Sequence, residues 1–165
     1  MKKVLFLDID GVLNSRRTHH ALGQYPTELY HLEGMSDPVA LRMLQRLCDS
    51  AGVSVVLSSA WRKSYAFKDV GKALGLPIID ATCDGWLKGL TQRGEEIQEW
   101  LDRHPDVEHW AIVDDDNDML PSQQSRFVRT SEREGLTFDA FSRICNLLQA
   151  SPGEGEPRVR TWMEA

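Results

Sequence analysis

Two aspartates follow the first apolar run of the chain, at a place where charged side chains are costly to bury. In the stretch "VLFLDIDGVLN", Asp8 and Asp10 come directly after four apolar residues, and Gly11 follows. A carboxylate there can act as a nucleophile that attacks phosphorus and forms an aspartyl-phosphate. A second carboxylate two residues on can protonate the leaving oxygen and then activate water. The simpler alternative is a turn at the end of a strand, in which both aspartates only cap backbone N–H groups.

Two more polar clusters end apolar runs later in the chain. Ser58 and Ser59 follow "VVL", and the acidic stretch "DDDND" at 114–118 follows "AIV". The carboxyl ends of parallel strands lie at one edge of a sheet, so we expect the three clusters to meet there. Carboxylates gathered together repel one another unless a cation lies between them, and hard oxygen ligands suit Mg²⁺. We therefore predict a magnesium site that uses Asp114 or Asp115.

The acidic stretch also resembles part of a calcium-binding loop, and this alternative is tested by spacing. Asp114, Asp116 and Asp118 fit the first, third and fifth positions of such a loop. The sixth position is Met119 instead of Gly, and the twelfth is Ser125 instead of Glu. The calcium loop is therefore excluded, while a contribution of Asp118 to the magnesium site stays open, as does a merely solvated acidic turn.

A phosphoryl group also needs hydrogen-bond donors and positive charge around it. The Ser58 hydroxyl is one candidate donor, and Ser59 is a second; the alternative is that they cap the following helix. Arg93 stands at a predicted helix start, where its guanidinium and the helix dipole can face a phosphate. Further candidate substrate contacts are Arg62, Lys63, Lys88 and Arg16, each of which can also be an ordinary surface cation.

Composition places limits on the class of protein. The chain has 165 residues, 41% of them hydrophobic, which fits one domain with a substantial core. The net charge of −6 argues against a protein that coats nucleic acid through an overall basic field. The three cysteines are far apart and form no CxxC pair, so neither a zinc knuckle nor a disulfide framework is indicated. The N-terminal apolar run ends at Asp8, too early for a signal peptide or membrane span, and we expect a cytoplasmic protein without a membrane partner.

Apolar periodicity predicts strands that alternate with helices, which is typical of an α/β fold with a mostly parallel sheet. Strands are predicted at 4–7, 53–57, 78–79, 109–113 and 126–130, and helices at 36–52, 61–74, 93–104 and 137–150. The segments 14–36 and 80–92 are predicted as irregular loops, because Gly, Pro and polar residues interrupt both patterns. We expect one domain over residues 1–150 and a C-terminal tail over 151–165.

These motifs together resemble the haloacid dehalogenase (HAD) superfamily of phosphohydrolases. Its first motif matches Asp8 to Val12, its second matches Ser58 in "VVLSS", and its fourth matches Asp114 and Asp115 in "AIVDDD". The third motif is normally a lysine, and here Arg93 and Lys88 are both candidates. More narrowly, "FLDIDGVLN", "LSSAWR", "RGEEIQEWL" and "REGLT" resemble the HAD domain of Swiss Army Knife RNA repair proteins.

The resemblance implies a Rossmann-like three-layer sandwich and a Mg²⁺-dependent phosphomonoester hydrolase with Asp8 as the nucleophile. It also implies that the Asp10 backbone carbonyl joins the side chains of Asp8, Asp114 and Asp115 around the metal. The segment 14–36 is too short for a full cap domain, so we expect an open site with little or no cap. Such a site admits a nucleotide or the end of a polynucleotide, and no obligate protein partner is inferred. Two alternatives remain: a phosphatase of small metabolites, and a catalytically idle HAD-like binding or regulatory module.

Overall fold

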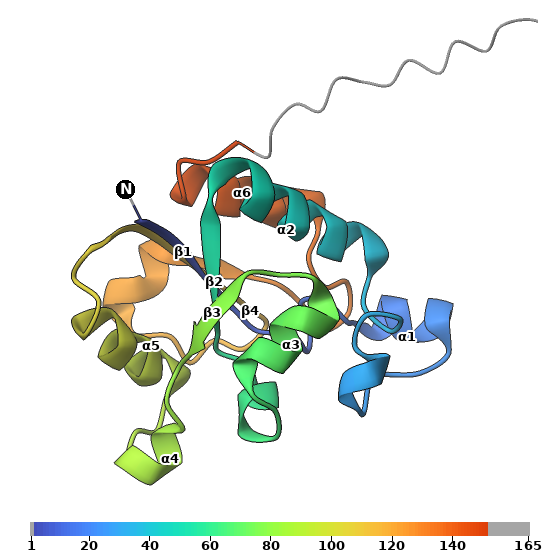
Figure 1. The fold of residues 1–165 in the computed structure, drawn as a ribbon, viewed down its shortest axis with the longest axis horizontal. Helices are drawn as coiled ribbons and strands as arrows, with labels where there is room; N and C mark the ends of the chain where they lie inside the picture. Colours follow the sequence, from blue (N-terminus) through green and yellow to red (C-terminus); the bar gives the residue numbers. More distant parts are fainter. Residues whose placement is uncertain (1, 152–165) are drawn as a thin grey trace, which may run out of the picture.

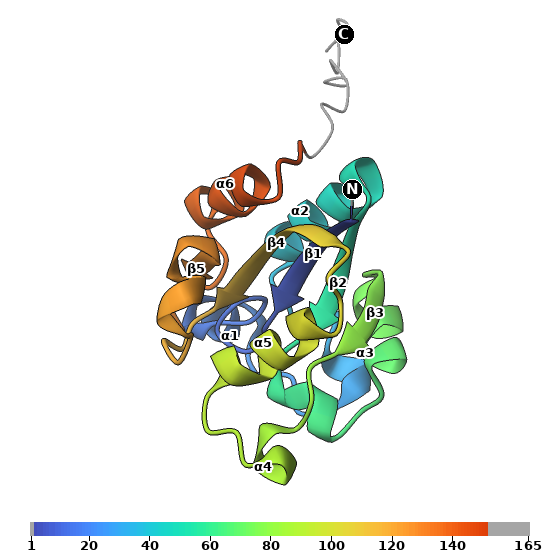
Figure 2. The ribbon, with the colours of Figure 1, turned by 90° about the vertical axis from the view of Figure 1, so that its left-hand side faces the viewer.

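A five-stranded parallel sheet forms the centre of the protein. In the computed structural model, which describes residues 2–151, the strands are β1 (Lys2–Leu7), β2 (Val53–Leu57), β3 (Ile78–Ala81), β4 (Val107–Asp114) and β5 (Phe127–Arg129). Their order is β3-β2-β1-β4-β5, and every pair is parallel (Figure 1 labels β1 to β4, and Figure 2 labels all five strands). The predicted α/β fold is therefore confirmed.

Helices cover both faces of this sheet, which gives three layers (Figure 2). The described helices are α1 (Arg16–Leu22), α2 (Pro38–Ala51), α3 (Phe67–Leu74), α4 (Gly85–Lys88), α5 (Arg93–Asp102) and α6 (Phe138–Leu147). Leu5 and Leu7 of β1 point into the larger core, which contains apolar residues of α2, α3 and α6. Val4 and Phe6 point to the opposite face, where they pack with Ile97 and other residues of α5. Because side chains alternate along this buried strand, residues of β1 pack against helices on both faces of the sheet.

The structure differs most from the prediction between residues 14 and 36, for which the sequence predicts an irregular loop. Instead α1 forms, because Ser15 and Thr18 make a reciprocal capping box and Gly23 ends the helix with a φ of 90°. The backbone N–H of Arg16 also donates to the Glu132 carbonyl at 2.8 Å. A helix this short is marginal alone, so the tertiary contact explains why the sequence pattern did not reveal it.

The predicted helix over 61–74 is two elements. A 3₁₀ helix, η2 (Ala60–Lys63), precedes α3, and Ala66 between them has an extended backbone with ψ of 138°. The expected loop over 80–92 likewise contains the short helix α4. Two further 3₁₀ helices, η1 (Leu29–His31) and η3 (Pro121–Arg126), lie in connections.

The predicted tail at 151–165 lies outside the described residues except for Ser151. Among residues 2–151, none of the helices is long and apolar enough to cross a membrane.

Candidate active site

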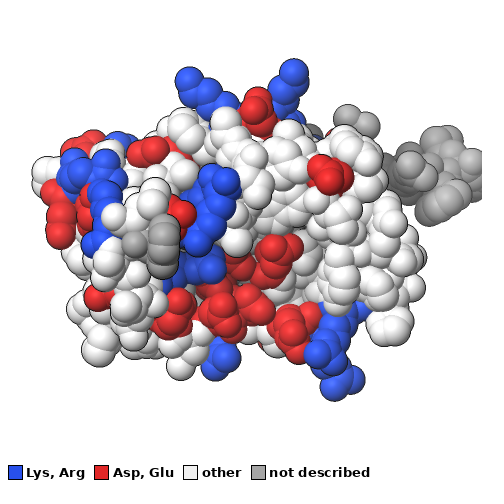
Figure 3. Space-filling model, turned by 90° about the horizontal axis from the view of Figure 1, so that it is seen from below, with Lys and Arg blue, Asp and Glu red and all other residues white. Residues whose placement is uncertain are grey.

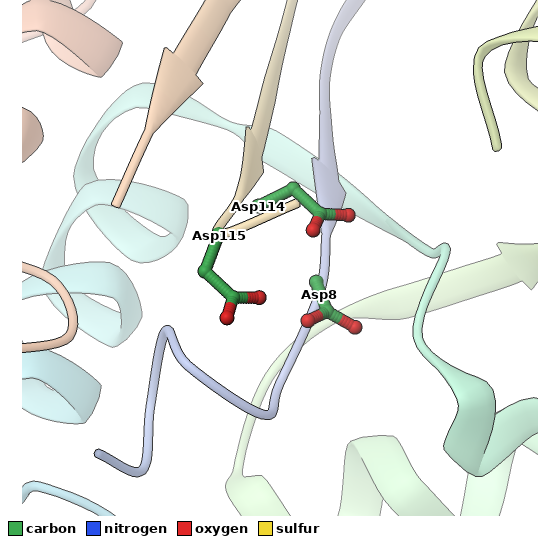
Figure 4. A group of neighbouring side chains, drawn as sticks. All are labelled: Asp8, Asp114 and Asp115. Carbon is green, nitrogen blue, oxygen red and sulfur yellow. The ribbon is translucent and has the colours of Figure 1, made fainter. Parts of the chain in front are cut away.

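Three carboxylates converge where β1 and β4 end. Asp114 is the last residue of β4, Asp115 follows it, and Asp8 comes directly after β1. Leu7 and Val113 are partners in the paired strands, so Asp8 and Asp114 leave the sheet side by side. Each of the three carboxylates offers an oxygen atom within 4.8 Å of the others (Figure 4). The strand ends thus bring Asp8 together with Asp114 and Asp115.

Asp114 is the most deeply buried of the three, with none of its surface exposed. Its Oδ1 atom accepts a hydrogen bond from the Asp116 backbone N–H at 3.0 Å. Its Oδ2 atom accepts no hydrogen bond from the described residues. Burial, followed by the neighbouring charge of Asp8, raises the pKa of Asp114 to about 8. A buried oxygen that accepts no hydrogen bond within residues 2–151, beside two more carboxylates, fits a site for a hard divalent cation such as Mg²⁺.

Arg93, the first residue of α5, supplies the positive charge of the site. Its Nη1 atom donates to Asp8 Oδ1 at 3.0 Å and to the Ser58 carbonyl at 2.7 Å, and it lies 3.2 Å from Asp114 Oδ2. Burial raises the pKa of Asp8 to about 6, an effect that the charge of Arg93 partly opposes. Although burial disfavours the charged guanidinium, Asp114 and Asp8 raise the pKa of Arg93. Among the predicted cations, Arg93 is therefore the one that contacts Asp8 and Asp114 in the described structure.

The start of α5 is held against the connection that follows β4. The Arg93 backbone N–H donates to Asp118 Oδ2 at 3.0 Å, and the Gln123 side chain donates to the Gly94 carbonyl at 2.8 Å. A Cβ atom on Gly94 would lie 2.5 Å from the Leu120 backbone nitrogen, so only glycine allows this approach. Asp118 is therefore bound to the helix start and lies outside the group of three carboxylates.

Asp10 is exposed and is held by two donors. Asn14 Nδ2 donates to its Oδ1 atom at 2.8 Å, and the Trp61 indole N–H donates to its Oδ2 atom at 3.1 Å. Gly11 makes the turn with a φ of 76°, and a Cβ there would lie 2.3 Å from the Asp115 carboxyl carbon. The sequence predicted Asp10 as a site residue but not its contacts with Asn14 and Trp61. The Asp10 side chain does not join the three-carboxylate group.

Ser58 and Ser59 lie directly after β2 and are both fully buried. Neither hydroxyl has a hydrogen-bond partner among the described residues. The helix-cap alternative is not supported, because the Ser59 side chain makes no capping bond to η2, and α3 is preceded by Ala66. The Ser58 backbone N–H donates to the Leu7 carbonyl at 3.0 Å, which places this serine beside Asp8.

Arg62 occupies a different position from the one predicted. Its guanidinium donates to the carbonyls of Ser58 and Ser59, each at 2.7 Å, and to Glu96 Oε2 at 2.5 Å. Only 6% of its side chain is exposed. These bonds tie the loop after β2 to α5, so the direct substrate contact predicted for Arg62 is corrected to a role in positioning that loop.

The other three predicted cations pair with acids outside the three-carboxylate group, and Lys63 pairs with Asp84 at 3.4 Å. Lys88, on α4, forms an ion pair with Glu99 and does not line the cavity that contains Asp8. Arg16, on α1, pairs with Glu132 at 2.7 Å, and Glu132 lines that cavity. Arg16 is thus close to the entrance, but its charge is balanced by an acid.

The site lies in an open cavity of about 410 Å³ at the carboxyl edge of the sheet. Its lining includes Asp8, Asp10, Arg93, Asp115 and Glu132. Seen from below in Figure 3, acidic side chains gather at the centre of this face, with basic side chains around them. The geometry suits a phosphate that lies between a metal ion held by the carboxylate cluster, an arginine and buried hydroxyl groups.

Comparison with known protein families agrees with this geometry. The model of the HAD domain in Swiss Army Knife RNA repair proteins matches residues 4–141, which is most of the chain and includes the residues of all three strand-end clusters. No curated protein matches, and no solved structure matches. The five-stranded parallel sheet, the carboxylate cluster and the family match lead to one conclusion: the chain belongs to the HAD superfamily, in the family of domains found in Swiss Army Knife RNA repair proteins.

Proposed function

We propose that the protein is a Mg²⁺-dependent phosphomonoester hydrolase that acts through an aspartyl-phosphate on nucleotides or nucleic-acid ends. The observation that carries the proposal is the buried carboxylate of Asp8, which contacts Arg93 and lies within reach of Asp114 and Asp115. The family match supports phosphohydrolase chemistry in general. Every acid of the motifs is present, which favours an enzyme over an idle binding module.

In the first half of the proposed reaction, an Asp8 carboxylate oxygen attacks the phosphorus atom and the bond to the leaving oxygen breaks. Asp10 gives its proton to that oxygen, so the products are an alcohol and a phosphorylated Asp8. Arg93 balances negative charge on the phosphoryl oxygens, and the buried Ser58 hydroxyl is a donor without another partner among the described residues.

In the second half, Asp10 takes a proton from a water molecule, whose oxygen attacks the phosphorus atom. The bond to Asp8 breaks, inorganic phosphate is released, and both carboxyl groups return to their starting states. Asp8, Asp114, Asp115 and the Asp10 carbonyl would hold Mg²⁺, which neutralises charge on the phosphoryl group when bound.

Three features support nucleotides or nucleic-acid ends as substrates. The cavity is open, and the segment 14–36 forms only α1 and η1, so a large substrate can approach. Tyr25, which is 42% exposed, lines the entrance and stacks on His19. The matched family is named for RNA repair proteins.

The test is hydrolysis of p-nitrophenyl phosphate with and without Mg²⁺, for the natural protein and for Asp8→Asn. The substitution keeps the shape of the side chain but removes the nucleophile and one metal charge. We expect a loss of activity of about three orders of magnitude or more, as for removal of other nucleophiles. Asp49→Asn, on the exposed face of α2, is the matched control and should retain full activity. Substantial turnover by Asp8→Asn would disprove the covalent mechanism.

A further inference from the structure

Asp10 lies on the border between two cavities. Asp10 and Ala60 line the cavity that contains Asp8, and they also line a second cavity of about 440 Å³. The remaining walls of the second cavity include Thr27 and Glu28 before η1, Trp61 in η2, and Tyr65 after it. We call this second space the Tyr65 cavity.

The fixed carboxyl group of Asp10 decides where a leaving group must lie. Asn14 and Trp61 hold one carboxyl oxygen each, so this group cannot turn freely toward a distant atom. A proton donor must come within about 3 Å of the oxygen that it protonates, directly or through one water molecule. The phosphoryl group belongs with Asp8, Arg93 and Asp115 in the first cavity. The group bonded to its leaving oxygen therefore extends past Asp10 into the Tyr65 cavity.

The lining of the Tyr65 cavity has a distinct chemistry. Asp10 and Glu28 provide carboxylates, and Thr27 and Ser64 provide hydroxyl groups. The Tyr65 ring stacks on Trp61 at 5.6 Å between ring centroids, and the Tyr65 hydroxyl donates to Glu28 Oε2 at 2.7 Å. None of the described residues that line this cavity is Lys or Arg. A second phosphate is therefore repelled there, whereas hydroxyl donors find acceptors and a flat ring finds an aromatic wall.

Three cations near the site line a different cavity. Lys63, Arg62 and Arg93 line this third cavity together with the acids Glu96 and Asp118, and Asp10 does not line it. A polynucleotide whose end is hydrolysed keeps a phosphodiester on the leaving group. That charged group would have to lie beside Asp10 and Glu28, away from these cations.

We propose that the Tyr65 cavity is the leaving-group site and that it accepts an uncharged, hydroxyl-bearing group. Among nucleotides this selects the nucleoside of a monophosphate over a polynucleotide end, whose leaving group is charged. The inference rests on the proposed function, because a leaving group exists only if the protein cleaves a phosphoester. It narrows the substrate class of that same site.

The experiment compares two substrates that differ by one phosphate: adenosine 3′-monophosphate and adenosine 3′,5′-bisphosphate. Whichever phosphate of the bisphosphate is attacked, the leaving group still carries the other. With the full chain and Mg²⁺, we expect kcat/KM for the bisphosphate to be lower by about tenfold, since the Glu28 carboxylate faces its extra charge and no Lys or Arg among the described lining residues offsets it. Glu28→Lys should reduce this preference at least severalfold. Glu33→Lys makes the same charge change on the same segment, but Glu33 does not line the cavity, so this control should keep the preference.

The outcomes separate the two proposals. One outcome is that the protein hydrolyses p-nitrophenyl phosphate and also hydrolyses the bisphosphate at least as well as the monophosphate. That result would overturn the leaving-group assignment and leave the proposed function standing. A preference for the monophosphate that Glu28→Lys and Glu33→Lys change equally would also overturn it. Absence of hydrolysis of every phosphoester tested would overturn the proposed function and this inference with it. Glu28→Gln, which keeps the shape of the side chain, serves if Glu28→Lys fails to fold, and it should weaken the preference in the same direction.

Discussion

Arg93 illustrates how a single residue of this site depends on its surroundings. Its Nη1 atom contacts Asp8, Asp114 and the Ser58 carbonyl, which belong to three different segments of the chain. A lysine could place one charge there, but the planar guanidinium also has a fixed donor geometry. Arg93 is therefore the residue we expect to hold the phosphoryl group, and Lys88, paired with Glu99, is not.

Replacement of these two cations should have unequal effects. Arg93→Ala removes a buried charge that contacts the nucleophile, so we expect kcat/KM on p-nitrophenyl phosphate to fall by about a hundredfold or more. Lys88→Ala breaks an exposed ion pair, which contributes at most about 1 kcal/mol of stability, and it should leave activity near that of the natural protein. Steady-state kinetics of the two variants measure these changes in kcat/KM. A greater loss in Lys88→Ala would assign the third motif to Lys88.

Trp61 contributes through its indole N–H, which holds the proton donor of the proposed reaction. Trp61→Phe keeps an aromatic ring and removes this hydrogen bond, so the Asp10 carboxyl group loses one of the two donors that hold it in place. A p-nitrophenolate leaving group needs little protonation, whereas an alkoxide needs a proton. We therefore expect the loss in kcat/KM to be about tenfold greater for an alkyl phosphate than for p-nitrophenyl phosphate.

The control for this substitution is Trp110→Phe, which changes a tryptophan that packs on Phe6 away from Asp10. It should alter both substrates to the same extent. Equal losses for the two leaving groups in Trp61→Phe would show that Trp61 acts only through packing.

At the scale of elements, the placement of α5 decides whether Arg93 reaches the carboxylates. Glu96 on this helix pairs with Arg62 and accepts from the Gly85 backbone N–H at 2.9 Å, which ties α5 to the loops after β2 and β3. Glu96 and the Arg62 side chain are both largely buried, so breaking the pair leaves an uncompensated charge. The sequence identified α5 but not this network, because the partners lie far apart along the chain.

Gly94→Ala tests the approach of α5 to the connection after β4. Alanine is the better helix former by about 1 kcal/mol, so propensity alone predicts stabilisation. The added Cβ would lie 2.5 Å from the backbone nitrogen of Leu120, however, and a backbone atom cannot move aside as a flexible side chain does. We expect a loss of about 1 to 3 kcal/mol and reduced kcat, measured by thermal unfolding and kinetics. In the control Gly34→Ala, the nearest atom is 4.0 Å away, and no comparable loss should appear. An unchanged Gly94→Ala variant would contradict the close approach.

At the scale of the whole molecule, the carboxylate cluster links stability to pH and to metal. Asp114 binds a proton more tightly in the folded protein, with a pKa of about 8, than in the unfolded chain, where its ordinary value is near 4. Between these values the folded state holds the extra proton, so the metal-free protein should lose stability as pH rises. Asp8, with a pKa of about 6, acts in the same direction over the lower part of this range.

We therefore expect the free energy of unfolding of the metal-free protein to fall by about 1 kcal/mol per pH unit between pH 6 and pH 8. Thermal or urea unfolding in EDTA at pH 6, 7 and 8 measures this slope. Mg²⁺ competes with the protons, so its stabilising effect should grow over the same range. Asp114→Asn should remove most of the slope, whereas Asp49→Asn should keep it. A metal-free protein whose stability rises from pH 6 to pH 8 would contradict the raised pKa of Asp114.

Much of the fold and part of the site could be predicted from local patterns. Continuous apolar runs such as 53–57 and the amphipathic pattern of 38–51 define buried strands and a packed helix without reference to the rest of the chain. The pattern failed where structure depends on distant partners. The helix α1 has its own cap, but its first two backbone N–H groups donate to the carbonyls of residues 132 and 133. The break between η2 and α3 follows a 3₁₀ helix in which the Arg62 side chain is buried.

The sequence by itself determined that acids and hydroxyls stand at the ends of buried strands, because strand burial and residue order are local properties. It therefore indicated Asp8, Asp114 and Asp115 as partners, with Ser58 beside them. Only the tertiary structure decided that Arg93, rather than Lys88 or Arg62, contacts the Asp8 carboxylate. A guanidinium reaches only a few ångströms, so its role depends on where its helix is packed. The same packing set Trp61 against Asp10, a contact between residues 51 positions apart that no local pattern encodes.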